Sequence, residues 1–220
     1  MIPPEPLSDA TLLTDCRKVA QRDPDLAEAL ARFGFPPLWA RPQGCPTLVH
    51  IILEQQVSLE SAQAAFDRLR SAAGILTPQR FLEFDDAALK TIGFSRQKTG
   101  YVRQLAQALL DGELDLAELA DMDDEAVRAA LIRMKGIGLW TANTYLLMAL
   151  LRPDVLPSGD RALVLAVQRV KRLPTCPTSI ELEAMSQSWR PWRSAAVRIF
   201  WQFYLNGGMN DMRWQMQACV

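Results

Sequence analysis

The sequence is poor in the residues that build metal centres. Its 220 residues include a single histidine, His50, and four cysteines, Cys16, Cys45, Cys176 and Cys219, which lie far apart and form no CxxC pair. Zinc and iron–sulfur sites need clustered thiolate or imidazole ligands, and disulfide scaffolds are small and rich in cysteine. We therefore expect neither a metal hydrolase nor a disulfide framework, and an activity that requires no cofactor.

Long hydrophobic runs are also missing. No apolar stretch reaches the ~20 residues that span a bilayer, and the opening MIPPEPLSDA lacks the basic and apolar regions of a secretory signal. We expect a cytoplasmic protein with no membrane contact. With 49% hydrophobic and 22% charged residues, the chain has enough apolar side chains for a sizeable core, which argues against disorder.

The formal net charge of −1 hides an uneven distribution of charge along the chain. Residues 128–198 contain 11 Lys/Arg and 4 Asp/Glu, whereas residues 1–127 contain 12 Lys/Arg and 20 Asp/Glu. A basic segment of this size predicts a surface that meets a polyanion. Basic residues that only decorate helix surfaces explain the same pattern equally well.

Apolar residues recur at helical spacing along most of the chain. Leu59, Ala62, Phe66 and Leu69 follow this spacing, as do the apolar residues of 127–134. No segment alternates as a strand does, and the breaks are rich in Gly, Pro or Asp. The sequence therefore predicts an all-α protein of eight to ten helices.

The helices are expected to form two lobes around a cleft. We place one lobe at residues 46–157, including a pair of helices joined by a tight turn at 131–150. The second lobe comprises residues 1–45 and 158–220. A cleft between lobes is a common place for a binding site.

The turn within 131–150 has the sequence MKGIG. Gly136 and Gly138 allow a sharp turn and close approach to another molecule. The helix that follows begins with unpaired amides at the positive end of its dipole, which favours an anion. The amides of Gly136, Gly138 and Thr141 are candidate phosphate ligands, and Lys135 adds a cation. An ordinary hairpin between two helices is the alternative interpretation.

A lone aspartate, Asp160, follows the sequence PSG and precedes the apolar run ALVLAVQRV. It is therefore expected at a helix N-terminus, where a carboxylate is stabilised. The simplest interpretation is a helix cap, a role that Ser158 would fill equally well. Spacing alone leaves a catalytic role open.

Four motifs, taken in order, resemble the helix-hairpin-helix superfamily of DNA glycosylases, and within it the 3-methyladenine DNA glycosylase II branch. They are IILEQQVSLESA (51–62), MKGIGLWTAN (134–143), RPDVLPSGD (152–160) and WRPWRSAA (189–196). The resemblance extends from about Pro46 to Leu205. It implies a monomeric enzyme whose helix-hairpin-helix motif, at 131–150, binds the backbone of double-stranded DNA.

The resemblance also implies roles for individual residues. Asp160 matches the catalytic aspartate, and Gln56, next to Gln55, matches the residue wedged into the duplex. Trp192 matches a position that lines the base pocket. An electron-rich ring at this position would attract a cationic alkylated base. The full set of pocket candidates is Trp192, Trp140, Tyr145 and Trp39, of which the last two lack a supporting motif. Thr144 stands where the branch has a tyrosine.

In this superfamily a hairpin of the form LPGIG holds a monovalent cation through main-chain carbonyls. By position, these carbonyls belong to Ile132, Met134 and Ile137, so a structural Na+ or K+ is implied. The sequence departs from the pattern at Lys135, where proline is usual. The lysine leaves the amide donors in place, although the turn is less constrained than with proline.

The implied activity is base excision repair by hydrolysis of the N-glycosidic bond of alkylated purines, such as 3-methyladenine and 7-methylguanine, in flipped nucleotides of duplex DNA. Relatives that also cut the strand carry a lysine four residues after the first hairpin glycine. Trp140 occupies that position, which predicts a glycosylase without lyase activity.

Two alternatives belong to other functional classes. The first is a non-catalytic helix-hairpin-helix module that only binds DNA. The second is a helical protein–protein adaptor, which leaves the glycine turn and the basic segment unexplained. Asp160 and the aromatic set separate the enzyme from the pure binder, since binding alone needs neither.

Overall fold

The computed structural model describes residues 3–210, and this part of the chain contains twelve α-helices and no strand. The all-α prediction is confirmed, but the expected number of eight to ten helices is too low. Two helices, α5 (Pro78–Leu82) and α6 (Asp86–Ile92), are too short to show a clear hydrophobic period. None of the described helices is long and apolar enough to cross a membrane.

Most helices begin directly after a residue of a type that commonly caps a helix N-terminus. Nine of the twelve follow a Ser, Thr or Asp whose side chain accepts a hydrogen bond from a first-turn amide. Such a cap stabilises a helix by about 1 kcal/mol. The exceptions are α3 (Cys45–Glu54), α9 (Leu139–Met148) and α12 (Arg193–Leu205). Helix α9 begins at Gly138, so no side chain caps its first-turn amides.

The chain divides into two compact units, unit 1 (Ala40–Leu150) and unit 2 (Pro4–Trp39 with residues 151–210). These boundaries lie a few residues before the positions expected from the sequence, after 45 and after 157. The amide of Arg41 donates to the carbonyl of Met148, which ties the segment before residue 46 to unit 1. The carboxylate of Asp154 accepts bonds from Arg193, which ties residues 151–157 to unit 2.

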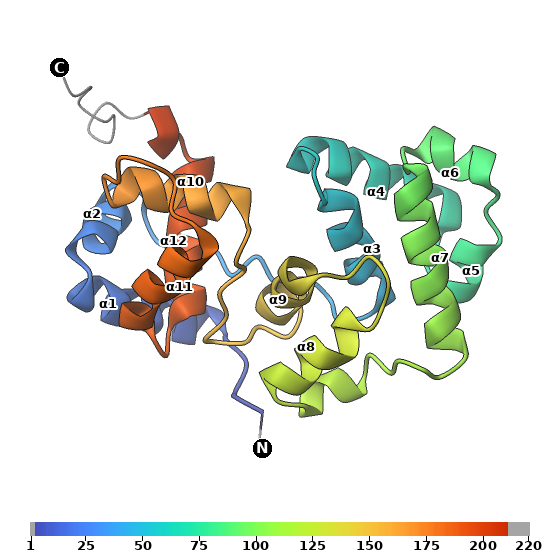
Figure 1. Cartoon of the computed structure of the whole chain (residues 1–220), viewed down its shortest axis with the longest axis horizontal. Helices are drawn as coiled ribbons and strands as arrows, with labels where there is room; N and C mark the ends of the chain where they lie inside the picture. The colour runs from blue at the N-terminus through green and yellow to red at the C-terminus, as the bar shows by residue number, and fades with distance from the viewer. Residues whose placement is uncertain (1–2, 211–220) are drawn as a thin grey trace. The chain divides into compact units, whose positions relative to one another are not determined.

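Helices α3 and α9 of unit 1 are mostly buried, and α3 packs against α4, α7 and α9 (Figure 1). Residues 141–147 of α9 are all buried, and the helix packs against α3 and α8. In α4, Ala62, Phe66 and Leu69 are buried as their spacing predicts, whereas Leu59 is 56% exposed. The helices of unit 1 are α3 (Cys45–Glu54), α4 (Leu59–Ala73), α5, α6, α7 (Arg96–Leu110), α8 (Asp124–Ile132) and α9 (Leu139–Met148).

Unit 2 is built around α12, which packs against α1, α2 and α10 (Figure 1). Its helices are α1 (Asp9–Arg22), α2 (Pro24–Phe33), α10 (Arg161–Val170), α11 (Ser179–Ser186) and α12 (Arg193–Leu205). Arg198 of α12 is fully buried and donates to the carbonyls of Leu38 and Ser194. Burial lowers its pKa to about 10, so the guanidinium stays charged at neutral pH and fixes the segment that ends at Trp39.

The structure describes three of the four cysteines. Cys16 and Cys45 are buried, Cys176 is exposed, and all three are free. Cys219 lies outside the described residues. Burial raises the pKa of both buried thiols to about 12, so neither is a thiolate at neutral pH.

Candidate DNA-binding and catalytic site

The two helices predicted at 131–150 are α8 and α9, and residues 133–138 form the turn between them. Ile137 is buried in unit 1, and its amide donates to the carbonyl of Met134 at 3.0 Å. Gly136 has φ +87, and a Cβ there would lie 2.1 Å from the ring of Tyr101. Both the backbone conformation and the lack of space therefore require glycine at this position.

The turn opens onto a depression of about 360 Å³ on the surface of unit 1. Its lining comes from the turn, from the end of α3 and from the start of α7. It consists of Gln55, Gln56, Gln97, Lys98, Tyr101, Gly136, Ile137 and Gly138. The predicted backbone-binding turn and the predicted wedge segment thus share one surface.

This surface offers backbone amides to an anion. Gly138 is exposed, and the first turn of α9 has no side-chain cap. Lys135 is exposed on the turn, as a phosphate-binding cation must be. The hydroxyl of Thr141 is buried and accepts a bond from Gln55, so only its amide stays a predicted phosphate ligand. Amides at a helix N-terminus bind phosphate without regard to base sequence.

Gln55 and Gln56 have opposite environments. The amide nitrogen of Gln55 donates to the carbonyl of Gly136 at 2.9 Å and to Oγ1 of Thr141 at 3.0 Å. Gln56 is exposed and has φ +58, a left-handed conformation that is strained for a residue with a Cβ. The geometry therefore favours Gln56 over Gln55 as the predicted wedge.

The carbonyls predicted to hold a monovalent cation belong to this turn. The oxygen of Met134 accepts the amide of Ile137. A carbonyl oxygen has a second lone pair, so this bond still leaves it able to ligate a hard cation. Together with the carbonyls of Ile132 and Ile137, it makes an all-oxygen donor set that suits Na+ or K+, and this site stays a prediction.

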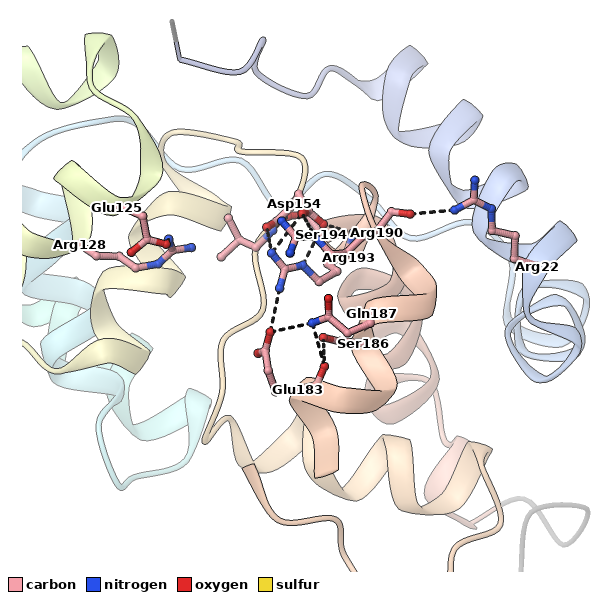
Figure 2. Close-up of polar contacts among 11 residues, drawn as sticks. Arg22, Glu125, Arg128, Asp154, Glu183, Ser186, Gln187, Arg190, Arg193 and Ser194 are labelled. Atoms are coloured by element: carbon pink, nitrogen blue, oxygen red, sulfur yellow. Dashed lines mark hydrogen bonds and ion pairs between the residues drawn. The ribbon is translucent and has the colours of Figure 1, made fainter. Parts of the chain in front are cut away.

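Ion pairs in unit 2 neutralise part of the basic excess of residues 128–198. Arg190 and Arg193 converge on Asp154, with nitrogen–oxygen distances of 3.0 and 2.8 Å (Figure 2). Lys171 pairs with Asp23, and both side chains are mostly buried. The excess read from the sequence therefore overstates the basic surface.

Trp192 was predicted to line the base pocket, but its ring faces cations of its own unit. The guanidinium of Arg22 lies 4.3 Å from the ring centroid, and the ammonium of Lys18 lies 5.0 Å from it. Both come from α1, far away in the sequence. Because these cations already occupy the ring's π-system, a cationic base would compete with them. The role of Trp192 in the base pocket stays a prediction.

Asp160 is instead accompanied by Trp201, which sequence reasoning missed. Asp160 is the N-cap of α10, and its Oδ1 accepts the amide of Leu163 at 2.7 Å. The same oxygen accepts the indole N–H of Trp201 at 3.0 Å. Two donors from different helices fix this carboxylate in one orientation. Trp201 lies beyond the motif WRPWRSAA, and the packing of α12 on α10 brings it to Asp160.

Trp39 completes the aromatic surroundings of Asp160. Its ring meets that of Trp201 edge to face, with centroids 6.2 Å apart. Trp39 has φ +49, a strained backbone that the bond from Arg198 to the preceding residue helps to hold. Unit 2 thus gathers one carboxylate and two indole rings. Of the predicted pocket residues, Trp39 lies beside this group.

The two remaining pocket candidates belong to unit 1. Tyr145 is fully buried, and its hydroxyl accepts the amide of Gly44 at 3.0 Å, so it packs in the core and cannot stack on a base. Burial raises the pKa of this phenol, which keeps it neutral. Trp140 is half-buried in the first turn of α9 and stays a candidate. Tyr145 was predicted wrongly because its position in the motif does not show which face of α9 it occupies.

Comparison with known proteins identifies related chains over most of this sequence. DNA-3-methyladenine glycosylase 1 of Schizosaccharomyces pombe is 29% identical over 159 residues, covering 70% of each chain. DNA-3-methyladenine glycosylase 2 of Escherichia coli is 30% identical over 167 residues, covering 74% of this chain. The matched region spans only 55% of the E. coli protein, and 57% of a Bacillus subtilis relative that is 31% identical.

A solved structure shares the fold across nearly the whole of its length. The S. pombe 3-methyladenine DNA glycosylase, in complex with abasic DNA, superposes with a TM-score of 0.82 at 25% identity. The superposition covers 86% of this chain and 95% of that chain. Residues 49–192 match the model of the HhH-GPD superfamily of base excision DNA repair proteins. The chain therefore belongs to this superfamily.

Proposed function

We propose that the protein is a monofunctional DNA glycosylase that removes alkylated purines, of the 3-methyladenine and 7-methylguanine type, from double-stranded DNA. The observation that carries this proposal is Asp160, whose carboxylate is held by α10 and Trp201 and accompanied by Trp39. A module that only binds DNA has no need of such a group. The relatives named for 3-methyladenine excision support the choice of substrate.

The proposed chemistry uses Asp160 as an anion. Breaking the bond between the base and C1′ develops positive charge on the deoxyribose. A fixed carboxylate stabilises that charge and orients or deprotonates the attacking water. An alkylated purine is itself cationic, so it leaves without needing a general acid. A neighbouring indole ring attracts such a base by as much as ~2 kcal/mol when the pair is desolvated.

The absence of lyase activity is proposed from the positions of the lysines. Strand cleavage of this type needs an unprotonated lysine amine that attacks the sugar. The described part of unit 2 contains two lysines, and both are engaged: Lys18 with Asp15 and Lys171 with Asp23. In unit 1, Trp140 stands where strand-cutting relatives carry their lysine, and Lys98 donates to the carbonyl of Leu53.

DNA binding is proposed to use the surface depression of unit 1. The amides of Gly136, Gly138 and the first turn of α9 bind a backbone phosphate, with Lys135 nearby. A monovalent cation bound by the turn carbonyls would add positive charge beside that phosphate. Gln56 fills the gap left by the flipped nucleotide. These contacts explain how a chain of net charge −1 binds a polyanion.

The test is product analysis on methylated duplex DNA. The protein is expected to release 3-methyladenine and 7-methylguanine and to leave abasic sites that break only after alkali. Borohydride, which traps a Schiff base, is expected to give no protein–DNA adduct. Strand breaks without alkali together with a trapped adduct would disprove the monofunctional assignment. DNA binding without base release would favour the non-catalytic module.

A further inference from the structure

We propose that Gln55 and Lys98 are positioning residues that hold the segment at Gln56 ready to enter the DNA duplex. The inference deepens the proposed function, on which it rests. It concerns unit 1 alone, where α3 packs against both α7 and α9 (Figure 1). Gln56 follows α3 directly, and its position is set by how the end of that helix is held.

The first contact joins α3 to the turn before α9. Gln55 is the C-terminal cap of α3, and its side-chain amide donates to Gly136 and Thr141. Both acceptors belong to the turn and helix that we propose bind the phosphate. One side chain therefore connects the wedge segment to the phosphate-binding segment, 81 residues away in the sequence.

The second contact joins α3 to α7. The ammonium of Lys98 donates to the carbonyl of Leu53 at 2.6 Å, in the last turn of α3. Carbonyls in the last turn of a helix lack intrahelical partners and favour a cation. Lys98 is half-buried, and its ammonium is thereby directed at the helix end. This contact gives the lysine a structural task in addition to its place on the surface depression.

Between these contacts, Gln56 is exposed with φ +58. A residue with a Cβ keeps such a conformation only where the surrounding contacts impose it, and strain of this kind gathers at functional sites. An inserted side chain works best when its position is fixed before DNA arrives, since ordering it on binding costs entropy. Gln55 and Lys98 remove that cost for Gln56.

The experiment measures insertion directly and does not depend on catalysis. The probe is a duplex with a tetrahydrofuran abasic analogue beside 2-aminopurine, whose fluorescence rises when it unstacks. Native protein, Gln56→Ala, Gln55→Met and Lys98→Met are compared at saturating concentration, after each dissociation constant is measured. Gln55→Met keeps the side-chain length but removes the donor. The matched control is Gln107→Met, an exposed residue of α7 outside the depression.

Native protein and the control are expected to raise the fluorescence fully, and Gln56→Ala only weakly. Gln55→Met and Lys98→Met should each lower the equilibrium constant for insertion by about tenfold. Adding Gln55→Met to Gln56→Ala should have no further effect, because Gln55 acts through Gln56. Thermal unfolding of each variant checks its fold, and Lys98→Met carries the test should Gln55→Met unfold.

A native signal from both Gln55→Met and Lys98→Met would overturn the inference. A native signal from Gln56→Ala would overturn it as well, since the inserted residue would then be another. The proposed function is judged separately, by base release from methylated DNA. Insertion by a native protein that releases no base would disprove the proposed function and leave this inference standing.

Discussion

Replacing Gly136 with alanine tests the structure of the turn quantitatively. At φ +87 an alanine costs roughly 1–2 kcal/mol more than glycine. Its Cβ would lie 2.1 Å from the ring of Tyr101, so the ring must move, which costs about 1–3 kcal/mol. Gly136→Ala should therefore lower the free energy of unfolding by about 2–5 kcal/mol, a large share of the roughly 5–15 kcal/mol typical of a folded domain.

Urea denaturation followed by circular dichroism measures this loss. Gly138→Ala is the matched control, because Gly138 has φ −95 and open space where its Cβ would lie. The control should change the free energy of unfolding by less than about 1 kcal/mol. In a Tyr101→Leu background, the cost of Gly136→Ala should fall, since much of the clash is gone. Equal losses in Gly136→Ala and Gly138→Ala would refute the reasoning.

Three further predictions concern other parts of the molecule. Trp201→Phe removes the indole donor to Asp160 and should slow single-turnover base release about ten- to hundredfold, whereas Trp192→Phe should slow it far less. Equal rates of base release by the two variants would contradict the proposed role of Trp201 beside Asp160. Asp23→Ala leaves the buried indole of Trp189 without its acceptor and removes one of the two carboxylates that pair with Lys171, so it should cost about 1–3 kcal/mol in thermal unfolding, against a near-neutral change at an exposed aspartate. Burial lowers the pKa of His50 below its ordinary 6.5, outweighing the attraction of a neighbouring glutamate. Since the unfolded chain then binds the proton more readily, the free energy of unfolding should fall as the pH is lowered from about 7 to about 5.5. His50→Gln should make the free energy of unfolding less dependent on pH in this range, and an unchanged dependence in the variant would contradict the prediction.

The helices and the turn were predictable because their signals are local. Capping residues such as Ser58 and Asp123 mark helix starts, and hydrophobic spacing marks buried faces. The tight turn was predictable from its two glycines, and the structure requires glycine at Gly136, where φ is positive and a Cβ would meet the ring of Tyr101. The position of Asp160 at a helix N-terminus was also predictable, because the apolar helical run begins directly after it in the sequence.

The pairing of aromatic rings was not predictable, because it depends on long-range packing. Trp192 lies in a motif, yet helix α1 supplies the cations that cover its ring. Trp201 lies in no quoted motif, yet packing of α12 on α10 brings its indole to Asp160. Charge shows the same limit: the basic excess of residues 128–198 is smaller on the surface than in the sequence, because residues such as Lys171 pair with acids of α2 and its N-cap.

The central claim is that the carboxylate of Asp160 stabilises the transition state for base release. The most direct test is single-turnover release of 3-methyladenine from methylated duplex DNA by the native protein and by Asp160→Asn, with DNA affinity measured in parallel. Asparagine keeps the size and an acceptor oxygen but removes the charge. We expect the rate to fall by at least about a hundredfold while affinity for DNA is kept. Release at the native rate by Asp160→Asn would contradict the account.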